Sequence, residues 1–459
     1  MDKSQSYLHK LTPRKLSMGP RGTRLKRLGR GLNPAITLLL LFAFLLTLWN
    51  SRPCPWWVNQ GFSGQPQGVN VRVNLNGLPV APEQVKSSHY AGEDHISESD
   101  IVSKKPSTVH LEEYRQLLKW KISDLKRNGV LLHLPPRNSC ASDQPDKVCI
   151  DQNCGAPLPD ADSDENLKSV LKPLTRLKET AIHETVKILG DIPRGFRITF
   201  ITAGSSDHYM ESQALIKNLH LTVFPGLQNY TFFYYDIGLD PVEREQLQRL
   251  CLCEVKKYPL EKLPERFSFI RGFTWKPIII NAHLASTDYI VWVDSSVRIR
   301  TGQLTPMFAA ARARGLAFSP VNKYALAEHT SRDMFQYFSN SACQFSRYNE
   351  AEAGFQVLHN DPFIRRFLLK VWTACALDPL CMCTDQSEAQ FHCNSKIRRY
   401  SKCHRFDQSA YSLILAKLFR ENIMSFYIPK GKYHILRRHH TENYFEKLES
   451  EVVGNLQLN

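Results

Sequence analysis

The sequence predicts an α/β fold, a mainly parallel β-sheet flanked by helices, and three observations support this class. Short apolar runs typical of buried strands recur after residue 196, and they alternate with helical patterns. Polar residues stand directly after these runs, where open α/β sheets bind ligands. The 459-residue chain is 42% hydrophobic and 22% charged, a composition that allows a sizeable buried core.

The expected elements of this region follow one another in strand–helix order. Strands are expected over 196–202, 230–236, 253–258, 289–293 and 354–358, the last one after a polar loop. Helices are expected over 210–220, from Asp240-Pro241 to Leu250, and over 276–285. Asp240 suits an N-cap and Pro241 the first helical position.

Two amphipathic helices are expected before the sheet. The first runs from residue 111 and stops at Gly129, and the second covers 167–189. Residues 135–164 between them form a loop that holds Cys140, Cys149 and Cys154.

The N-terminal third predicts a membrane anchor. Nine Lys and Arg residues and a single Asp occupy the first thirty positions and supply roughly half of the net charge of +15. The uncharged apolar run that follows, residues 34–49, extends to Trp57 as a spanning segment. The basic block then determines topology by the positive-inside rule and does not indicate nucleic-acid binding. The alternative, a cleaved signal peptide, lacks a small-residue cleavage site.

These features divide the chain into five regions. We expect a cytoplasmic tail (1–33), a transmembrane anchor (34–57), a stem and helical, disulfide-bearing linker (58–195), a catalytic domain (196–445) and a C-terminal tail (446–459). We expect a single-pass type II topology with a lumenal C-terminus, in a membrane of the secretory pathway such as the endoplasmic reticulum or a later compartment.

Cysteine usage agrees with a lumenal location. The 12 cysteines are Cys54, Cys140, Cys149, Cys154, Cys251, Cys253, Cys343, Cys375, Cys381, Cys383, Cys393 and Cys403, all after the apolar run. An even set in an oxidising compartment predicts disulfides, and the spacing does not favour zinc. Asn229-Tyr-Thr231 is a glycosylation sequon.

The order of several motifs resembles the GT-A glycosyltransferases, the nucleotide-diphospho-sugar transferase superfamily. These motifs are FITAGS, YYDIGLD, WKPIIINAHL before VWVDSSVRI, EAGFQVL and RFDQSAYSLIL, spread over residues 197–444. More narrowly, the chain resembles an animal family abundant in nematodes. The resemblance implies a GT-A-like sheet, a nucleotide-sugar donor and a glycan or glycoprotein acceptor.

The donor side of the expected site centres on Asp294. Family members carry Asp-x-Asp after this strand, and the second Asp contacts a metal that bridges the nucleotide diphosphate, whereas this sequence has Asp294-Ser295-Ser296. Asp294, Ser296 and either His434 or His439 could hold Mn²⁺ or Mg²⁺, but the missing carboxylate leaves the need for a cation open. Thr202 and Asp236 could contact the ribose or base of the donor nucleotide, or could equally be structural residues at the ends of their strands.

Cationic and acidic residues complete the expected site. Arg271 and Lys276 precede the Asp294 strand and could stabilise a departing diphosphate, with Arg298 as a second option. Glu352 and Asp407 are the candidate catalytic carboxylates, although Asp407 equally suits a helix N-cap. The sequence leaves open which of them accepts a proton and whether the reaction retains or inverts configuration.

The resulting functional hypothesis is a Golgi membrane glycosyltransferase that transfers a sugar from a nucleotide sugar to a hydroxyl group. The alternative is a transferase-like protein without catalytic activity that binds a glycan or a partner enzyme, which the replacement of the second Asp by Ser296 would suit. An adhesion ectodomain is disfavoured, because such domains are β-rich with short, evenly spaced strands.

Overall fold

The computed structural model describes residues 95–132, 134, 158–384, 393, 399–429 and 431–456. The chain divides into two compact units, Met1–Ser88 and His89–Asn459, and every described residue belongs to the second. The predicted tail and anchor (1–57) and residues 58–94 of the stem therefore lie outside the described residues. No helix among the described residues is long and apolar enough to span a bilayer.

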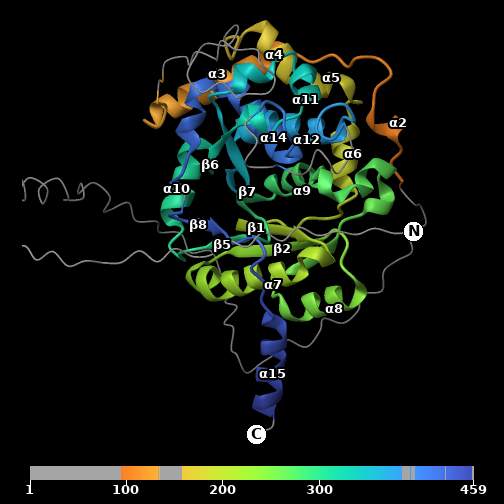
Figure 1. Cartoon of the computed structure of the whole chain (residues 1–459), viewed down its shortest axis with the longest axis vertical. Coiled ribbons are helices and arrows are strands. Elements are labelled where there is room, and N and C mark those ends of the chain that lie inside the picture. The colour runs from red at the N-terminus through yellow and green to blue at the C-terminus, as the bar shows by residue number, and fades with distance from the viewer. Residues whose placement is uncertain are drawn as a thin grey trace, which may run out of the picture. The chain divides into compact units, whose positions relative to one another are not determined.

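A six-stranded sheet forms the centre of the second unit, in the order β3-β2-β1-β4-β7-β6 (Figure 1). The strands are β1 (Phe196–Gly204), β2 (Tyr230–Asp236), β3 (Glu254–Lys257), β4 (Thr287–Val293), β6 (Leu316–Ala325) and β7 (Asn349–His359). The first four are parallel, and β7 runs antiparallel between β4 and β6. The prediction of a mainly parallel α/β sheet is confirmed.

A second, two-stranded ribbon lies beside this sheet. It pairs β5 (Val297–Ile299) with β8 (His434–Leu436) in antiparallel register, with Ile299 opposite His434. The ribbon brings the C-terminal part of the chain next to the residues that follow β4.

Helices cover both faces of the sheet (Figure 1). They are α2 (Glu98–Ile101), α3 (Leu111–Arg127), α4 (Asp164–Val170), α5 (Lys172–Arg176), α6 (Ala181–Lys187), α7 (Tyr209–Asn218), α8 (Pro241–Leu250), α9 (Trp275–Leu284), α10 (Thr305–Arg314), α11 (Arg332–Tyr337), α12 (Leu369–Leu377), α14 (Phe406–Phe419) and α15 (Tyr444–Leu456). The Asp240 side chain accepts from the amide of Glu243 in a capping box, so the predicted start of α8 is confirmed.

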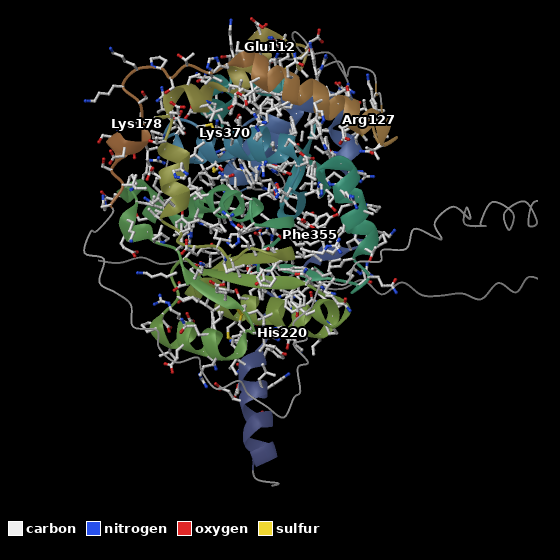
Figure 2. The ribbon with its side chains drawn as sticks, turned by 180° about the vertical axis from the view of Figure 1, so that it is seen from behind. Glu112, Arg127, Lys178, His220, Phe355 and Lys370 are labelled. Carbon is white, nitrogen blue, oxygen red and sulfur yellow. A yellow bond between two sulfur atoms is a disulfide. The ribbon has the colours of Figure 1, made fainter. Side chains whose placement is uncertain are left out.

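Alternate strand residues feed two hydrophobic clusters, one on each face, and side chains fill both (Figure 2). Ile201 and Trp292 join α9, α12 and α14 in the first cluster. Phe200, Val291 and Phe355 join α7, α8 and α10 in the second. The sheet is therefore buried on both faces, as parallel sheets require.

The helices before the sheet belong to the first cluster. Leu118 of α3 and Leu167 of α4 are fully buried there. The prediction of one helix over 167–189 is wrong, because the chain forms α4, α5 and α6 instead. Pro173 stands in the first turn of α5, where a proline is tolerated, whereas inside one long helix it would break the hydrogen bonding. After α5 the backbone of Leu177 is extended, which separates α5 from α6.

The expected polar loop before residue 354 is also wrong, since 349–353 belong to β7. Glu350 and Glu352 are buried within this strand at 0% and 2% exposure. A buried strand can hold them because partner side chains bind both carboxylates, as described below.

Disulfides are present among the described cysteines. They pair Cys251 with Cys253, Cys375 with Cys381 and Cys393 with Cys403, and Cys343 is also disulfide-bonded. Cys54, Cys140, Cys149 and Cys154 lie outside the described residues. Asn229 of the sequon is exposed in the turn before β2, and its glycosylation stays a prediction.

Candidate active site

Asp294 stands at the carboxyl end of β4, at the edge where such sheets bind ligands. Its backbone amide donates to the carbonyl of Gly354 on β7 at 2.8 Å. The indole Nε1 of Trp292 donates to Asp294 Oδ1 at 2.7 Å. The Asp294 side chain is 35% exposed, so its carboxylate is held through Oδ1 and is still partly open to solvent.

Lys276 joins Asp294 to a second carboxylate. This lysine belongs to α9 and is 2% exposed. Its Nζ lies 3.1 Å from Asp294 Oδ1 and 2.8 Å from Asp407 Oδ2. The structure thus brings three predicted site residues from three separate elements, α9, β4 and α14, into one ion cluster, which we call the Lys276 triad.

Burial and charge act against each other in this triad. Burial alone would lower the pKa of Lys276, but the carboxylates of Asp294 and Asp407 outweigh it and the net shift is upward. The ammonium therefore keeps its charge. Burial raises the pKa of the Asp407 carboxyl, an effect that Lys276 partly offsets and the charge of Asp294 reinforces.

The backbone next to the triad is strained. Phe273, three residues before Lys276, has φ 52°, and Phe406, next to Asp407, has φ 34°. Bulky residues seldom adopt positive φ, because their Cβ crowds the backbone. Such strain persists only where surrounding structure enforces it, and it concentrates at functional sites.

Gly354 allows Asp294 to approach β7. A Cβ at this position would lie 2.9 Å from Asp294 Oδ2. Any side chain would therefore displace the carboxylate, so the glycine fixes where Asp294 can stand.

Glu352 and His434 form a second buried pair near this edge. His434 Nε2 lies 3.1 Å from Glu352 Oε2, and both side chains are at most 3% exposed. The imidazole packs on the ring of Phe355, with ring centroids 4.1 Å apart and the two planes tilted by 31°. Glu352 Oε1 and His434 Nδ1 are buried without a hydrogen-bond partner among the described residues. The pair leaves one acceptor and one ring nitrogen for further chemistry.

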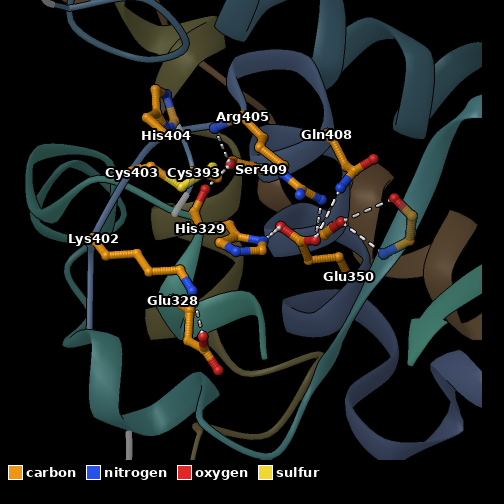
Figure 3. Close-up of polar contacts among 12 residues, drawn as sticks. Glu328, His329, Glu350, Cys393, Lys402, Cys403, His404, Arg405, Gln408 and Ser409 are labelled. Atoms are coloured by element: carbon orange, nitrogen blue, oxygen red, sulfur yellow. Dashed lines mark hydrogen bonds and ion pairs between the residues drawn. A yellow bond between two sulfur atoms is a disulfide. The ribbon is translucent and has the colours of Figure 1, made fainter. Parts of the chain in front are cut away.

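A polar cluster holds the start of α14 against β7 (Figure 3). Glu350 Oε1 bonds His329 Nδ1 at 3.0 Å, and its Oε2 accepts from Arg405 Nη1 at 2.9 Å and from Gln408 Nε2 at 3.0 Å. Gln408 Oε1 accepts from the backbone amide of Ala353 at 3.3 Å. Because Gln408 adjoins Asp407, this cluster sets the position of the triad's second carboxylate.

Sequence reasoning missed Glu350 as a member of this cluster. The signal was present, since Glu350 and Glu352 alternate along a segment that continues into a buried strand. Once the segment is recognised as a buried strand, its two acidic side chains are expected to be buried and therefore paired with other polar groups.

Thr202 and Asp236 lie away from solvent. Thr202 is fully buried in β1. Asp236 Oδ1 accepts from the amides of Gly238 and Leu239 at 2.8 and 2.7 Å, and its Oδ2 pairs with Arg244. Asp236 thus shapes the turn after β2, and a role of either residue in nucleoside binding stays a prediction.

The remaining cations differ in exposure. Arg271 is exposed in a 3₁₀ turn just before α9. Arg298 is 8% exposed and donates to the carbonyls of Ser295 and His440 at 2.5 and 2.9 Å. Burial lowers the pKa of Arg298 to about 10. Arg298 therefore braces the backbone around the Asp294 turn.

Two of the predicted metal ligands, Asp294 and His434, are already engaged by other side chains. Ser296 is 8% exposed, His434 is bonded to Glu352, and His439 is exposed with its amide on Glu211 Oε1 at 2.9 Å. In the described part of the chain, the only close group of three His, Cys, Asp or Glu ligand atoms is His329–Cys393–Cys403, whose cysteines form a disulfide. Asp294 Oδ1 already faces two donors. These residues do not fit a preformed divalent-cation site.

Comparison with known proteins gives matches only among solved structures. No protein-family model matches the chain, and no curated protein sequence does. The galactosyltransferase LgtC, solved with donor and acceptor sugar analogs, aligns at 14% identity over 49% of this chain and 71% of its own, with a TM-score of 0.26.

Other similar structures are transferases as well. Core-mannan synthase A from Aspergillus fumigatus, in its Mn/GDP form, aligns at 10% identity over 52% of this chain and 74% of its own, with a TM-score of 0.31. Mouse xyloside xylosyltransferase 1 aligns at 11% identity over 55% of this chain and 100% of its own, with a TM-score of 0.29. The match to the bifunctional glycosyltransferase WbbM spans 39% of that chain.

These similarities are too weak to carry an argument about chemistry. The narrower resemblance to an animal family stays a prediction. What the chain does must be argued from its own site.

Proposed function

We propose that this chain is a glycosyltransferase that moves a sugar from a nucleotide-sugar donor to a hydroxyl group of a glycan or glycoprotein. The observation that supports this most directly is the Lys276 triad at the carboxyl edge of a mainly parallel sheet. It combines a solvent-facing carboxylate, Asp294, with a buried carboxylate, Asp407, whose pKa burial raises. Perturbed acids at such an edge are typical of catalytic sites.

The proposed reaction uses these groups in separate roles. The acceptor oxygen bonds to the anomeric carbon while the bond from that carbon to the donor phosphate breaks, and the nucleoside diphosphate leaves with the electron pair. Asp294 orients the donor, and Asp407 or Glu352 accepts the hydroxyl proton. Lys276 keeps the two carboxylates of the triad together.

We further propose that the chain works in the Golgi membrane as a type II protein with a lumenal C-terminus. The basic block and apolar run of the N-terminal sequence support this, as do the disulfides, which persist in oxidising compartments. Localisation of a C-terminally tagged chain, with protease protection of the tag in intact vesicles, would test the topology.

A donor panel tests the activity itself. The full-length chain, purified in detergent, is incubated with common nucleotide sugars, and release of the nucleoside diphosphate is measured. We expect turnover with one donor, and a loss of about 100-fold or more in Asp294→Asn and Asp407→Asn. Asp288→Asn is the matched control, because Asp288 is exposed at the opposite end of β4. Absence of turnover and of nucleotide binding for every donor would refute the proposal.

The alternative, a binding protein without catalytic activity, also has an observation in its favour. Ser296 stands in place of the second carboxylate, and Lys276 engages both remaining ones. If this alternative holds, Asp294→Asn leaves the cellular role of the protein intact, whereas a transferase loses it.

A further inference from the structure

Four exposed basic residues lie beside the Asp294 turn. Arg437, Arg438, His439 and His440, which we call the basic segment, directly follow β8 and are all exposed. The amide of Arg437 donates to the carbonyl of Ser296 at 2.7 Å. The segment therefore begins within hydrogen-bond distance of the residue two positions after Asp294.

The backbone of the basic segment is fixed from several sides. Glu211 on α7 accepts from the His439 amide with Oε1, at 2.9 Å, and from Ser295 Oγ with Oε2, at 2.8 Å. Arg298 Nη2 donates to the carbonyl of His440 at 2.9 Å. His439 itself has φ 61°, a strained conformation for a residue other than glycine. One carboxylate thus ties the segment to the Asp294 turn.

The charges of this region are unbalanced toward positive. Arg298 is buried and donates to the carbonyl of His440 in this segment, while Arg437 and Arg438 are exposed and form no ion pair within the described residues. Glu211 accepts hydrogen bonds from Ser295 and His439, while Glu442 lies 2.9 Å from Lys217 Nζ and 4.0 Å from His440 Nε2, so no carboxylate pairs with Arg437 or Arg438 in the described part of the chain. An anion placed on the segment would meet guanidinium groups that are already fixed at their backbone.

The Lys276 triad cannot supply this charge to a ligand. Its single ammonium is buried and shared by two carboxylates, and the residues around Asp294 do not fit a divalent cation, as shown above. A negatively charged group next to Asp294 therefore needs another cationic partner, and the basic segment, which is bonded to Ser296, is adjacent to this position.

We propose that the basic segment binds the diphosphate of the donor nucleotide, and that no divalent cation bridges this diphosphate to Asp294. The inference rests on the proposed transferase function and deepens it. Arg437 and Arg438 neutralise the charge that develops on the departing diphosphate as the bond to the sugar breaks. His439 and His440 line the same stretch of backbone.

Nucleotide binding by the full-length chain in detergent tests this without relying on activity. Isothermal titration calorimetry is done with UDP and GDP, and with UMP and GMP, which lack the second phosphate. We expect one diphosphate to bind more tightly than its monophosphate, with an affinity that excess EDTA leaves unchanged. Arg437→Gln and Arg438→Gln should each weaken it about tenfold and reduce its dependence on NaCl concentration.

Two further variants make the comparison specific. Arg438→Lys keeps the charge and should retain most of the affinity, whereas Lys447→Gln removes one exposed charge on α15 and should change nothing. The substituted arginines are exposed, and a melting temperature equal to that of the wild type will confirm that each variant is folded.

Three results would overturn the inference. The first is loss of diphosphate binding in EDTA. The second is binding by Arg437→Gln and Arg438→Gln that is indistinguishable from that of Lys447→Gln. The third is that the two arginine variants bind a sulfated oligosaccharide more weakly than the wild type but bind UDP and GDP equally well. If wild type binds no nucleotide at all, the transferase proposal fails as well. If donor turnover persists while these variants behave like Lys447→Gln, only the role of the basic segment is wrong.

Discussion

Lys276 is the residue on which the candidate site depends. A lysine that is 2% exposed is costly to bury unless its charge is paired, and here two carboxylates pair it. The same contacts hold Asp407, itself buried, opposite the solvent-facing Asp294. The ammonium thus links the stability of the domain to the geometry of the site.

Replacing this lysine should damage stability and function together. In Lys276→Met the Asp407 carboxylate loses its buried partner, and we expect the free energy of unfolding to fall by about 3–5 kcal/mol. Chemical denaturation of the full chain measures it. Lys276→Met combined with Asp407→Asn should recover part of this loss. Lys257→Met, which removes an exposed lysine, serves as control, and an equal effect of both lysines would contradict the role of the triad.

A substitution at Gly354 should lower activity while leaving stability nearly unchanged. In Gly354→Ala the new Cβ would lie 2.9 Å from Asp294 Oδ2, so the carboxylate must move. We expect donor turnover to drop at least about tenfold, since even a small displacement of a group that positions the substrate slows the reaction strongly. The melting temperature should change little more than in Gly226→Ala, where the nearest atom is 3.5 Å away. Unchanged turnover would show that the position of Asp294 is not critical.

At the scale of elements, β7 organises the site. It carries Gly354 against Asp294, Glu352 against His434, and Glu350 against the first turn of α14. The segment before α14 is fixed by His404, whose Nδ1 accepts from the Ser331 amide at 3.2 Å while Nε2 donates to the Met382 carbonyl at 2.8 Å. These bonds require a neutral imidazole.

His404 should make the domain sensitive to acid. Burial lowers its pKa to about 4, from an ordinary value of 6.5. Between these two values the unfolded chain binds a proton that the folded chain does not, so stability falls as the pH drops. By pH 5 the contribution of His404 amounts to a loss of about 2 kcal/mol relative to pH 7.

Denaturation at pH 7 and pH 5 checks this value. His404→Gln can keep both hydrogen bonds without titrating, so it should lose less stability between the two pH values than the wild type does. His183→Gln removes an exposed histidine and should behave like the wild type. Equal losses in the wild type and His404→Gln would exclude His404 as the cause.

At the scale of the whole molecule, the helices before the sheet belong to its core. Leu118, Leu125, Leu167 and Leu171 are fully buried in the first cluster, together with α9, α12 and α14. Each such burial is worth about 2 kcal/mol, so four of them approach the typical net stability of about 5–15 kcal/mol. The start of the catalytic domain at residue 196 stays a prediction. For folding, we expect that the helices before this residue are needed as well.

Truncation tests this requirement. A chain that starts at residue 89, where the second compact unit begins, should be soluble, monodisperse in size-exclusion chromatography and cooperative in thermal unfolding. A chain that starts at residue 196 exposes the face that α3 to α6 cover and should aggregate. A folded, stable product from the shorter chain would show that these helices are dispensable.

Local patterns in the sequence were sufficient for β1 to β4 and the helices between them, but they did not reveal β6 or the helices α10 and α12. The strand over 230–236 and the helices around Pro241 and Lys276 follow from apolar periodicity and capping residues, which act over a few neighbouring positions. The same kind of pattern failed at 167–189, where Pro173 divides the helix, and before residue 354, where buried acids resemble a loop.

The sequence by itself determined the α/β class and the position of Asp294 after its strand, and it pointed to Lys276 and Asp407 as candidate site residues. Only the tertiary structure decided that these three form one ion cluster, that Glu352 pairs with His434, and that the basic segment lies on the Asp294 turn. The reason is physical. Local sequence governs backbone conformation, whereas contacts between residues in different strands and helices arise only when those elements pair and pack.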